Sequence, residues 1–384
     1  MLGIPELLDA LKGLRAGAIL NPTSITEDLR HLADVLHERK VLAALFGPEH
    51  GVRGDVQYLE KVADARDPRT GVPEYSLYGQ DFASLTPRDE HLRGLDALIF
   101  DVQDVGSRYY TYLATMGLAM RAAAKHKRRF LVLDRPNPIG GVAVEGGVIH
   151  PGFESFVGLW PVCARHGLTA GEYARFINER IGCDLHVIAM HGWRRDLYFE
   201  ETRLPWVMPS PNMPTPQTAL VYPGMCLLEG TNLSEGRGTT RPFELFGAPW
   251  LDPQRLADDL ARERFEGVGF RPSSFTPTWD KHKGQRCHGV QIHVAYPRGL
   301  DAVRLGVAAI VHARAQDPAK FRWRTEKYEF VEDKPAIDLL TGSAAFRTKA
   351  EEGTSVSQLC ALWEADRAAF ARRVRGISSL YQRR

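Results

Sequence analysis

The sequence lacks the features that define several classes of protein. Its five cysteines are scattered over 384 residues and form no Cys-x-x-Cys pair, which argues against a disulfide framework and a cysteine-ligated zinc site. The formal net charge is only +2, so neither a basic surface for nucleic acid nor an acidic tail is indicated. No apolar run reaches the roughly 18–20 residues of a membrane span. Glu6 and Asp9 interrupt the N-terminal apolar stretch, so we expect no signal peptide and a cytoplasmic protein.

Motifs for common cofactors are also missing. No Gly-x-Gly-x-x-Gly follows a strand and opens a helix, and no Gly-x-x-x-x-Gly-Lys-[Ser/Thr] occurs, so nicotinamide and P-loop chemistry have little support. No His-Glu-x-x-His occurs, and the other acidic and histidine positions follow no recognised metal spacing. We therefore expect no cofactor and no metal. One alternative stays open, a two-metal hydrolase built from His50, Asp101, Asp104 and Asp134.

The first half of the chain alternates short apolar runs with helical patterns. The runs cover residues 16–20, 41–46, 95–100 and 129–133. Runs that are apolar on both faces and are separated by helices are typical of a parallel sheet covered on both sides. The sequence therefore predicts an α/β fold with a Rossmann-like, mostly parallel sheet.

Polar residues indicate where three of the helices begin. Ser24-x-x-Glu27 and Thr169-x-x-Glu172 both have the spacing of a capping box, in which each side chain accepts a backbone N–H of the other residue. Ser107 is placed to cap the helix that follows the third apolar run.

The composition changes near residue 204. Residues 204–223 contain six prolines, so we expect a long extended loop and neither a helix nor a central strand. Loops of this length in compact proteins are usually functional or are linkers. A glycine-rich loop follows at 229–241.

The pattern after Trp250 predicts a smaller α+β unit. Helices are expected at 253–263, 301–315 and 355–373, with strands near 267–277 and 288–296. We therefore predict a Rossmann-like catalytic domain over 1–245, which includes both loops, and a smaller α+β domain over 246–384 that contributes to the cleft.

Polar side chains collect where the four apolar runs end. Since the carboxyl ends of parallel strands share one edge, and ligands bind in the crevice there, these residues are candidates for an active site. Asp and Asn in such places also cap helices or form turns, which is the alternative for the first and last runs. The candidates are Asn21, Glu49, His50, Asp101, Gln103, Asp104, Asp134, Arg135 and Asn137.

Glu49 is the strongest of these candidates. Glutamate is a poor turn former, yet this one lies between Pro48 and the pair His50-Gly51. Burial at the base of a cleft disfavours the ionised form of a carboxyl group, so Glu49 could hold a proton at neutral pH and act as a general acid. His50 either tunes and orients this acid or only hydrogen-bonds to backbone near the sheet edge.

Further candidates lie in the loops. Arg108 brings a cation to the third strand end, and Tyr109 and Tyr110 bring aromatic faces there. Tyr109 or Tyr112 could stack on a sugar ring, although core packing is the more frequent role of such rings. Arg237 and Arg241 could bind a carboxylate ligand with two parallel hydrogen bonds, or could form ion pairs with nearby glutamates.

Six segments together resemble one known family. They are LNPTSIT, FGPEHGVRGDVQ, DVQDVGSRYYTYL, LDRPNPIGG, the stretch from SPNMPTP to FGAPW, and the closing LLTGS…LW. They are similar to the exo-acting β-N-acetylmuramidases, the NamZ-type glycoside hydrolases of bacterial cell-wall recycling, and the resemblance runs through essentially the whole chain. It implies a Rossmann-like N-terminal domain, a smaller C-terminal domain and an active site in a cleft between or beside them.

The resemblance also implies an activity and roles for the candidates. The family releases N-acetylmuramic acid from the non-reducing end of peptidoglycan fragments, typically the disaccharide with N-acetylglucosamine, and its proposed catalytic glutamate corresponds to Glu49. Either Asp101 or Asp104 would then activate water at the opposite face, unless the 2-acetamido group of the substrate takes that part.

The remaining roles concern recognition of the terminal sugar. N-acetylmuramic acid carries a lactyl carboxylate, for which the available arginines are Arg108, Arg135, Arg237 and Arg241. Exo action needs a pocket that is closed at one end. Its expected walls are the proline-rich loop with Asn212 and the glycine-rich loop with Glu229 and Asn232.

Two other functions stay open on the sequence. The first is a non-catalytic protein that binds muropeptides, and the second is a metal-dependent hydrolase of an amide or phosphoester. In each case we expect a small-molecule partner and neither nucleic acid nor membrane, while the sequence gives no oligomeric state.

Overall fold

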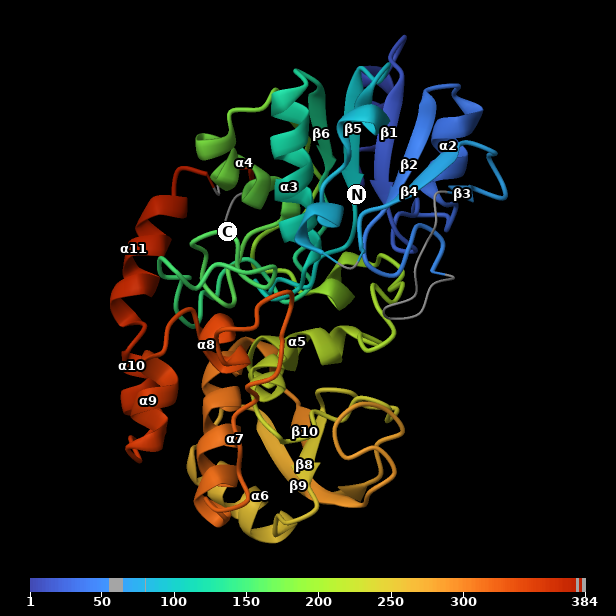
Figure 1. The fold of residues 1–384 in the computed structure, drawn as a ribbon. Coiled ribbons are helices and arrows are strands. Elements are labelled where there is room, and N and C mark those ends of the chain that lie inside the picture. The colour runs from blue at the N-terminus through green and yellow to red at the C-terminus, as the bar shows by residue number, and fades with distance from the viewer. Residues whose placement is uncertain (55–64, 80, 378–379, 382–384) are drawn as a thin grey trace.

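A computed structural model describes residues 1–54, 65–79, 81–377 and 380–381 of the chain. Figure 1 shows a large sheet with its helices at the top of the view and a small sheet at the bottom, with helix α5 (Pro216–Met225) between them. No helix among the described residues is long and apolar enough to cross a membrane.

The large sheet is mostly parallel, as the sequence predicts. Its seven strands lie in the order β3-β4-β2-β1-β5-β6-β7, and only β3 runs antiparallel to its neighbour. The four predicted apolar runs are confirmed as β1, β2, β5 and β6. The strands are β1 (Ala16–Leu20), β2 (Leu42–Gly47), β3 (Ala65–Arg66), β4 (Pro73–Ser76), β5 (Ala97–Asp101), β6 (Arg129–Leu133) and β7 (Leu185–Ile188).

Helices cover both faces of this sheet (Figure 1). Alternate residues of β1 show why: Ala18 and Leu20 pack in the core beneath α1 and α2, whereas Ile19 packs in the core beneath α3 and α4. A strand that is buried on both faces needs apolar residues at every position. The helices are α1 (Ile4–Ala10), α2 (Leu32–Glu38), α3 (Tyr112–Lys125) and α4 (Ala170–Ile181).

One of the three predicted helix starts is confirmed. The Thr169 side chain accepts the backbone N–H of Glu172, and the Glu172 side chain accepts that of Thr169, so the two form the capping box of α4. The prediction for Ser24 is wrong, because its hydroxyl donates to the Asp101 carbonyl and α2 begins only at Leu32, with His31 as its cap. The prediction for the third start is also wrong, because α3 begins at Tyr112, five residues beyond Ser107, with Thr111 as its N-cap residue.

The small sheet is antiparallel, in the order β8-β10-β9. The predicted strands and the first two helices of this region are confirmed, whereas the helix predicted over 355–373 is divided in two at Trp363, whose ring stacks on Phe346. The elements are β8 (Leu245–Ala248), α6 (Pro253–Arg262), β9 (Val268–Phe275), β10 (Cys287–Val294), α7 (Ala302–Gln316), α8 (Ala336–Thr341), α9 (Ala345–Glu351), α10 (Val356–Ala361) and α11 (Glu364–Val374).

The expectation that residues 204–223 contain no helix is wrong, because α5 begins within them. Thr215 caps this helix by accepting the N–H of Thr218, and Pro216 occupies the first turn, where its missing N–H costs nothing. The second proline, Pro223, lies inside the helix. Packing against α7 offsets its unfavourable effect: Gly224 approaches so closely that a Cβ there would lie 1.7 Å from the Ala302 carbonyl oxygen.

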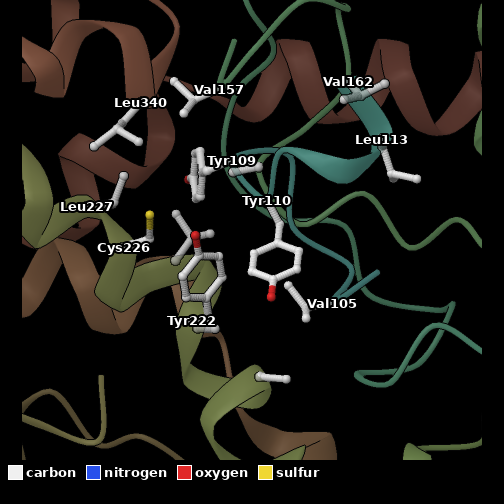
Figure 2. Close-up of a cluster of buried hydrophobic side chains, with 14 of the residues drawn as sticks. Val105, Tyr109, Tyr110, Leu113, Val157, Val162, Tyr222, Cys226, Leu227 and Leu340 are labelled. Carbon is white, nitrogen blue, oxygen red and sulfur yellow. The ribbon is translucent and has the colours of Figure 1, made fainter. Parts of the chain in front are cut away.

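A buried core joins α5 to the loop before α3. Figure 2 shows Tyr109 and Tyr110 of that loop in the same cluster as Tyr222 and Leu227, with the Tyr110 and Tyr222 ring centroids 5.6 Å apart. The large sheet and the region around α5 are therefore packed together.

The chain returns to the large sheet after the small one. Phe370 of α11 packs edge-on against Phe176 of α4, with 5.6 Å between the ring centroids. Tyr381 packs against Trp193, and its hydroxyl donates to Asp134 at 2.7 Å. The domain boundary at 245/246 stays a prediction.

Candidate active site

A tight turn follows β2 and carries Glu49. The Gly51 N–H donates to the Pro48 carbonyl at 2.9 Å, and both His50 (φ +73°) and Gly51 (φ +75°) adopt the left-handed conformation. Glycine adopts this conformation freely, but a histidine there is strained, and such strain is found most often at functional sites.

The Glu49 carboxyl is held by neutral groups. The Thr111 hydroxyl donates to its Oε2 at 3.1 Å, and the Tyr78 side chain also hydrogen-bonds to it. The side chain is only 16% exposed. Among the described residues, no lysine or arginine forms an ion pair with Glu49, so burial raises its pKa above the ordinary value for glutamate.

His50 adds no compensating charge. Its Nε2 lies 3.9 Å from Oε1 of Glu49, but burial and the nearby charge of Arg237 lower the pKa of this imidazole to about 4. His50 is therefore neutral near pH 7, and the protonated form of Glu49 is favoured.

A second glutamate nearby has the opposite electrostatic environment. Arg237 donates to Glu229 at 2.5 Å and also pairs with Glu235 at 3.1 Å, while the Tyr328 hydroxyl donates to the other Glu229 oxygen at 2.7 Å. Burial alone would raise the pKa of Glu229, but these contacts outweigh it and hold that pKa below the ordinary value. Glu229 is therefore ionised at neutral pH.

A third glutamate, Glu329, comes from the segment between α7 and α8. Burial and the charges of Glu49 and Glu229 raise the pKa of Glu329 to about 8. Sequence reasoning missed this residue, because the stretch around it matches no motif. The three glutamates offer both a carboxyl that keeps its proton and one that loses it, which acid–base hydrolysis requires.

The other strand ends lie where the sequence places them. The sheet order β2-β1-β5-β6 sets the four ends side by side. Asp101 and Arg135 form a buried ion pair, with Nη2 of the arginine 2.9 Å from Oδ2 of the aspartate. Asp134 accepts from the Thr169 hydroxyl at 2.7 Å and from the Gly171 N–H at 2.8 Å, so it joins β6 to the start of α4.

Three further rim residues bind neighbouring backbone. Gln103 donates to the carbonyls of Asp104 and Pro136 at 2.7 and 2.8 Å. Asp104 accepts the N–H of Gly106 at 2.6 Å. Asn137 donates to the Leu168 carbonyl at 3.0 Å, and these bonds fix the shape of the loops at the rim.

Asn21 stabilises the turn in which it lies, since its side-chain oxygen accepts the N–H of Thr23 at 2.9 Å. A small pocket lies beside it at the ends of β1 and β5. Thr23, Gln103, Arg135 and Trp206 are among the residues that line this pocket, and Glu49 is not.

The cation and rings of the loop before α3 are in the core. The Arg108 guanidinium donates to the carbonyls of Gly147 and Leu340 and, at 2.8 Å, to that of Val162. Tyr109 and Tyr110 are buried in the cluster of Figure 2.

The remaining candidates lie in the two loops after residue 204. Asn212 is half-buried, in a loop that the Tyr112 hydroxyl holds by donating to the Pro209 carbonyl. Asn232 bonds to the backbone of Lys320. Arg241 is half-exposed and pairs with Glu244 at 3.1 Å.

A metal site has no support in the geometry of the described residues, where no three histidine, cysteine or acidic side chains come together in a way that could hold an ion. Asp101, Asp104 and Asp134 each bind a different protein group.

Family models account for nearly the whole chain. The model for the N-terminal part of exo-β-N-acetylmuramidase NamZ matches residues 16–217, and the model for its C-terminal part matches residues 220–379. A curated protein of Bacillus subtilis (strain 168), the peptidoglycan β-N-acetylmuramidase NamZ, is 46% identical over 365 residues, which are 94% of this chain and 86% of that protein.

Two solved structures from Bacteroides fragilis NCTC 9343 have the same fold. Both are crystal structures of DUF1343 family proteins. The match to the first has a TM-score of 0.89 and 36% sequence identity, and it covers 99% of this chain and 98% of that protein's chain. The match to the second has a TM-score of 0.79 and 30% sequence identity, and it covers 100% of this chain and 99% of that protein's chain.

Proposed function

Because the chain belongs to the family of NamZ-type exo-β-N-acetylmuramidases, we propose that Glu49 is the general acid of its glycosidase reaction. The chain is a glycoside hydrolase of peptidoglycan fragments, and its reaction is hydrolysis of the β-glycosidic bond of N-acetylmuramic acid at the non-reducing end.

One observation supports the role of Glu49 above all. It is a buried carboxyl group that accepts hydrogen bonds from hydroxyl groups, lies beside a neutral histidine and, within the described residues, forms no ion pair with a lysine or arginine. Burial favours the protonated form of such a group, which is the form that can give a proton to an oxygen that becomes basic in the transition state.

The acid step follows from this protonation state. As the bond from C1 of the sugar to the departing oxygen breaks, the bonding pair moves to that oxygen, which takes the proton of Glu49. The ring then passes through an oxocarbenium-like state, which a nearby negative charge stabilises. Glu229 is ionised and its charge acts on Glu49, so we propose Glu229 as the source of that negative charge.

The group that acts at the opposite face is either such a carboxylate or the 2-acetamido group of the substrate. For the lactyl carboxylate, Arg108 and Arg135 already donate to protein acceptors in the core. Arg237 is likewise bound by Glu229 and Glu235. Arg241, whose side chain is half-exposed, is therefore the arginine that we propose for it.

The test of this function is the variant Glu49→Gln, which keeps the shape of the side chain and removes its proton. We expect turnover of a chromogenic N-acetylmuraminide to fall by about 10²–10⁴-fold, the usual contribution of a general acid. The matched control is Glu38→Gln at the exposed end of α2, which should retain the wild-type rate.

Calorimetry on the same variants separates catalysis from binding. We expect Glu49→Gln to bind the disaccharide without releasing N-acetylmuramic acid. A wild-type rate in the folded variant would remove Glu49 as the acid, and binding without turnover by the wild-type protein would favour a muropeptide-binding protein instead.

A further inference from the structure

We propose that Thr111 is a positioning residue that acts through Glu49, by holding the carboxyl group of the acid with its hydroxyl group. This inference rests on the proposed role of Glu49 as the general acid. Thr111 lies at the start of α3, where a threonine usually has a structural role.

Thr111 occupies the N-cap position of α3 but does not cap the helix. An N-cap threonine normally has an extended backbone, and its side-chain oxygen accepts an N–H group of the first turn. Thr169 and Thr215 do this at the starts of α4 and α5. Thr111 has helical backbone angles instead (φ −69°, ψ −11°), and the first turn of α3, which is described in full, donates no hydrogen bond to its side chain.

The Thr111 hydroxyl binds the acid in place of the helix. It donates to Oε2 of Glu49 at 3.1 Å, although the two residues lie 62 positions apart in the sequence. The last torsion angle of a glutamate side chain is only loosely fixed by its own covalent geometry. A hydrogen bond of this kind therefore decides how the carboxyl group is turned.

The start of α3 is a rigid place from which to hold a carboxyl group. Thr111 is buried, and its carbonyl accepts the N–H of Thr115 at 2.9 Å. A β-branched side chain on such a backbone has few rotamers. The next residue, Tyr112, has its hydroxyl 3.5 Å from the backbone carbonyl oxygen of Glu49. The start of α3 therefore contacts both the side chain and the backbone of the acid.

The hydrogen bond from Thr111 matters most as the proton leaves Glu49. A hydroxyl group binds a carboxylate more strongly than a neutral carboxyl group, so this bond stabilises the form that Glu49 takes after it has protonated the departing oxygen. Burial raises the pKa of Glu49, and the bond from Thr111 opposes that effect. Since an interaction that strengthens in the transition state lowers the barrier, we expect Thr111 to contribute to kcat rather than to binding of the sugar.

The titratable and charged groups around Glu49 come from several elements. They are His50, Tyr78, Tyr110, Tyr112, Glu229, Arg237 and Glu329. A substitution at Thr111 leaves all of them in the chain, so a change in the pH profile would report the lost hydroxyl group.

The variant Thr111→Val removes the hydroxyl group and keeps the shape of the side chain. On a chromogenic N-acetylmuraminide we expect kcat to fall by about 10–10²-fold, as when a reacting group is misplaced, with KM nearly unchanged. The acid must be protonated, so activity is lost as pH rises through the pKa of Glu49. Without the bond from Thr111 that pKa is higher, and we expect the basic limb of the kcat/KM profile to move to higher pH.

Conservative and distant variants provide the controls. Thr111→Ser keeps the hydroxyl group and should restore both kcat and the basic limb. Thr348→Val on α9 removes an exposed hydroxyl group that donates to the Ala344 carbonyl at 3.0 Å, and it should leave both unchanged. Since Thr111→Val breaks no helix cap, it should unfold at nearly the wild-type temperature. If it fails to fold, Thr111→Ala also lacks the hydroxyl group and provides the same readouts.

A double variant tests whether Thr111 acts through Glu49. If it does, adding Thr111→Val to Glu49→Gln should cost little further activity, and a further loss of about 10–10²-fold would overturn the inference. A wild-type kcat and an unmoved basic limb in folded Thr111→Val would also overturn it. So would an equal loss of kcat in Thr111→Ser, which would assign the effect to packing. Glu49→Gln alone separates these results from failure of the proposed function, since a wild-type rate in that variant would remove the acid itself.

Discussion

Removing the buried ion pair between Asp101 and Arg135 would show whether the polar residues at the carboxyl ends of the large sheet's strands stabilise the fold or take part in the reaction. Both side chains are less than 10% exposed, and the guanidinium also donates to the Ile25 carbonyl at 2.9 Å. Removing one partner of such a pair costs about 3–5 kcal/mol, because the other charge stays buried and uncompensated. We therefore expect Arg135→Met to lower the free energy of unfolding by about 3–5 kcal/mol.

This loss is large enough to measure by heating. The entropy of unfolding is roughly 2.1 cal/mol/K per residue, or roughly 0.8 kcal/mol/K for the whole chain, so the melting temperature should fall by about 4–6 °C if the chain unfolds as one unit. Calorimetry supplies the unfolding enthalpy that this conversion needs. The double variant Arg135→Met with Asp101→Asn removes both charges and should recover part of the loss, which a double-mutant cycle quantifies.

A surface ion pair provides the control for this prediction, and removal of the Asp101 charge alone provides the result that would refute it. Asp184→Asn breaks a surface pair with Arg129 and should leave the melting temperature unchanged within error. If Asp101→Asn melted like the wild type and yet lost turnover, Asp101 would belong to the chemistry and our account of the rim would be wrong.

The remaining predictions concern the contact of α5 with α7 and the question of whether the reaction needs a metal ion. Gly224→Ala should destabilise the protein strongly, since the added Cβ would lie 1.7 Å from the Ala302 carbonyl oxygen. The control is Gly269→Ala, whose added Cβ would have no atom within 4 Å and which should have nearly the wild-type melting temperature. Equal melting temperatures for the two variants would contradict the close contact. Exhaustive chelation should leave the rate on the chromogenic substrate unchanged, because no three potential metal ligands among the described residues come together, and a loss that added zinc restores would contradict this.

Much of the large sheet could be predicted from local patterns. The runs that became β1, β2, β5 and β6 are apolar at nearly every position because both faces are covered. The short strand β7 has only one buried residue among its four, so it gave no such signal. The six prolines of residues 204–223 argue against any helix there, and yet α5 begins among them. Pro216 lies in the first turn, where a helix tolerates proline, and packing against α7 offsets the effect of Pro223.

The site was harder to predict than the fold. Glu49 stood out because its turn has no structural need for glutamate. For Asp101 the sequence showed a polar residue at a strand end but not that Arg135 neutralises it, since pairing between distant segments is a tertiary property. Glu329 could not be found at all, because a Glu-Phe pair is an unusual choice for its turn and its partners lie in distant parts of the sequence.

The contact between Tyr381 and Asp134 has a consequence for biosynthesis. The ribosome makes Tyr381 only after the small sheet and helices α6–α11 have been made, and yet this side chain completes the hydrogen bonding of a loop of the large sheet. The first-made half therefore leaves a buried aspartate incompletely bonded until the second half has been translated. Newly made chains should pass through a stage in which the early sheet is formed but this corner of it is still open to water.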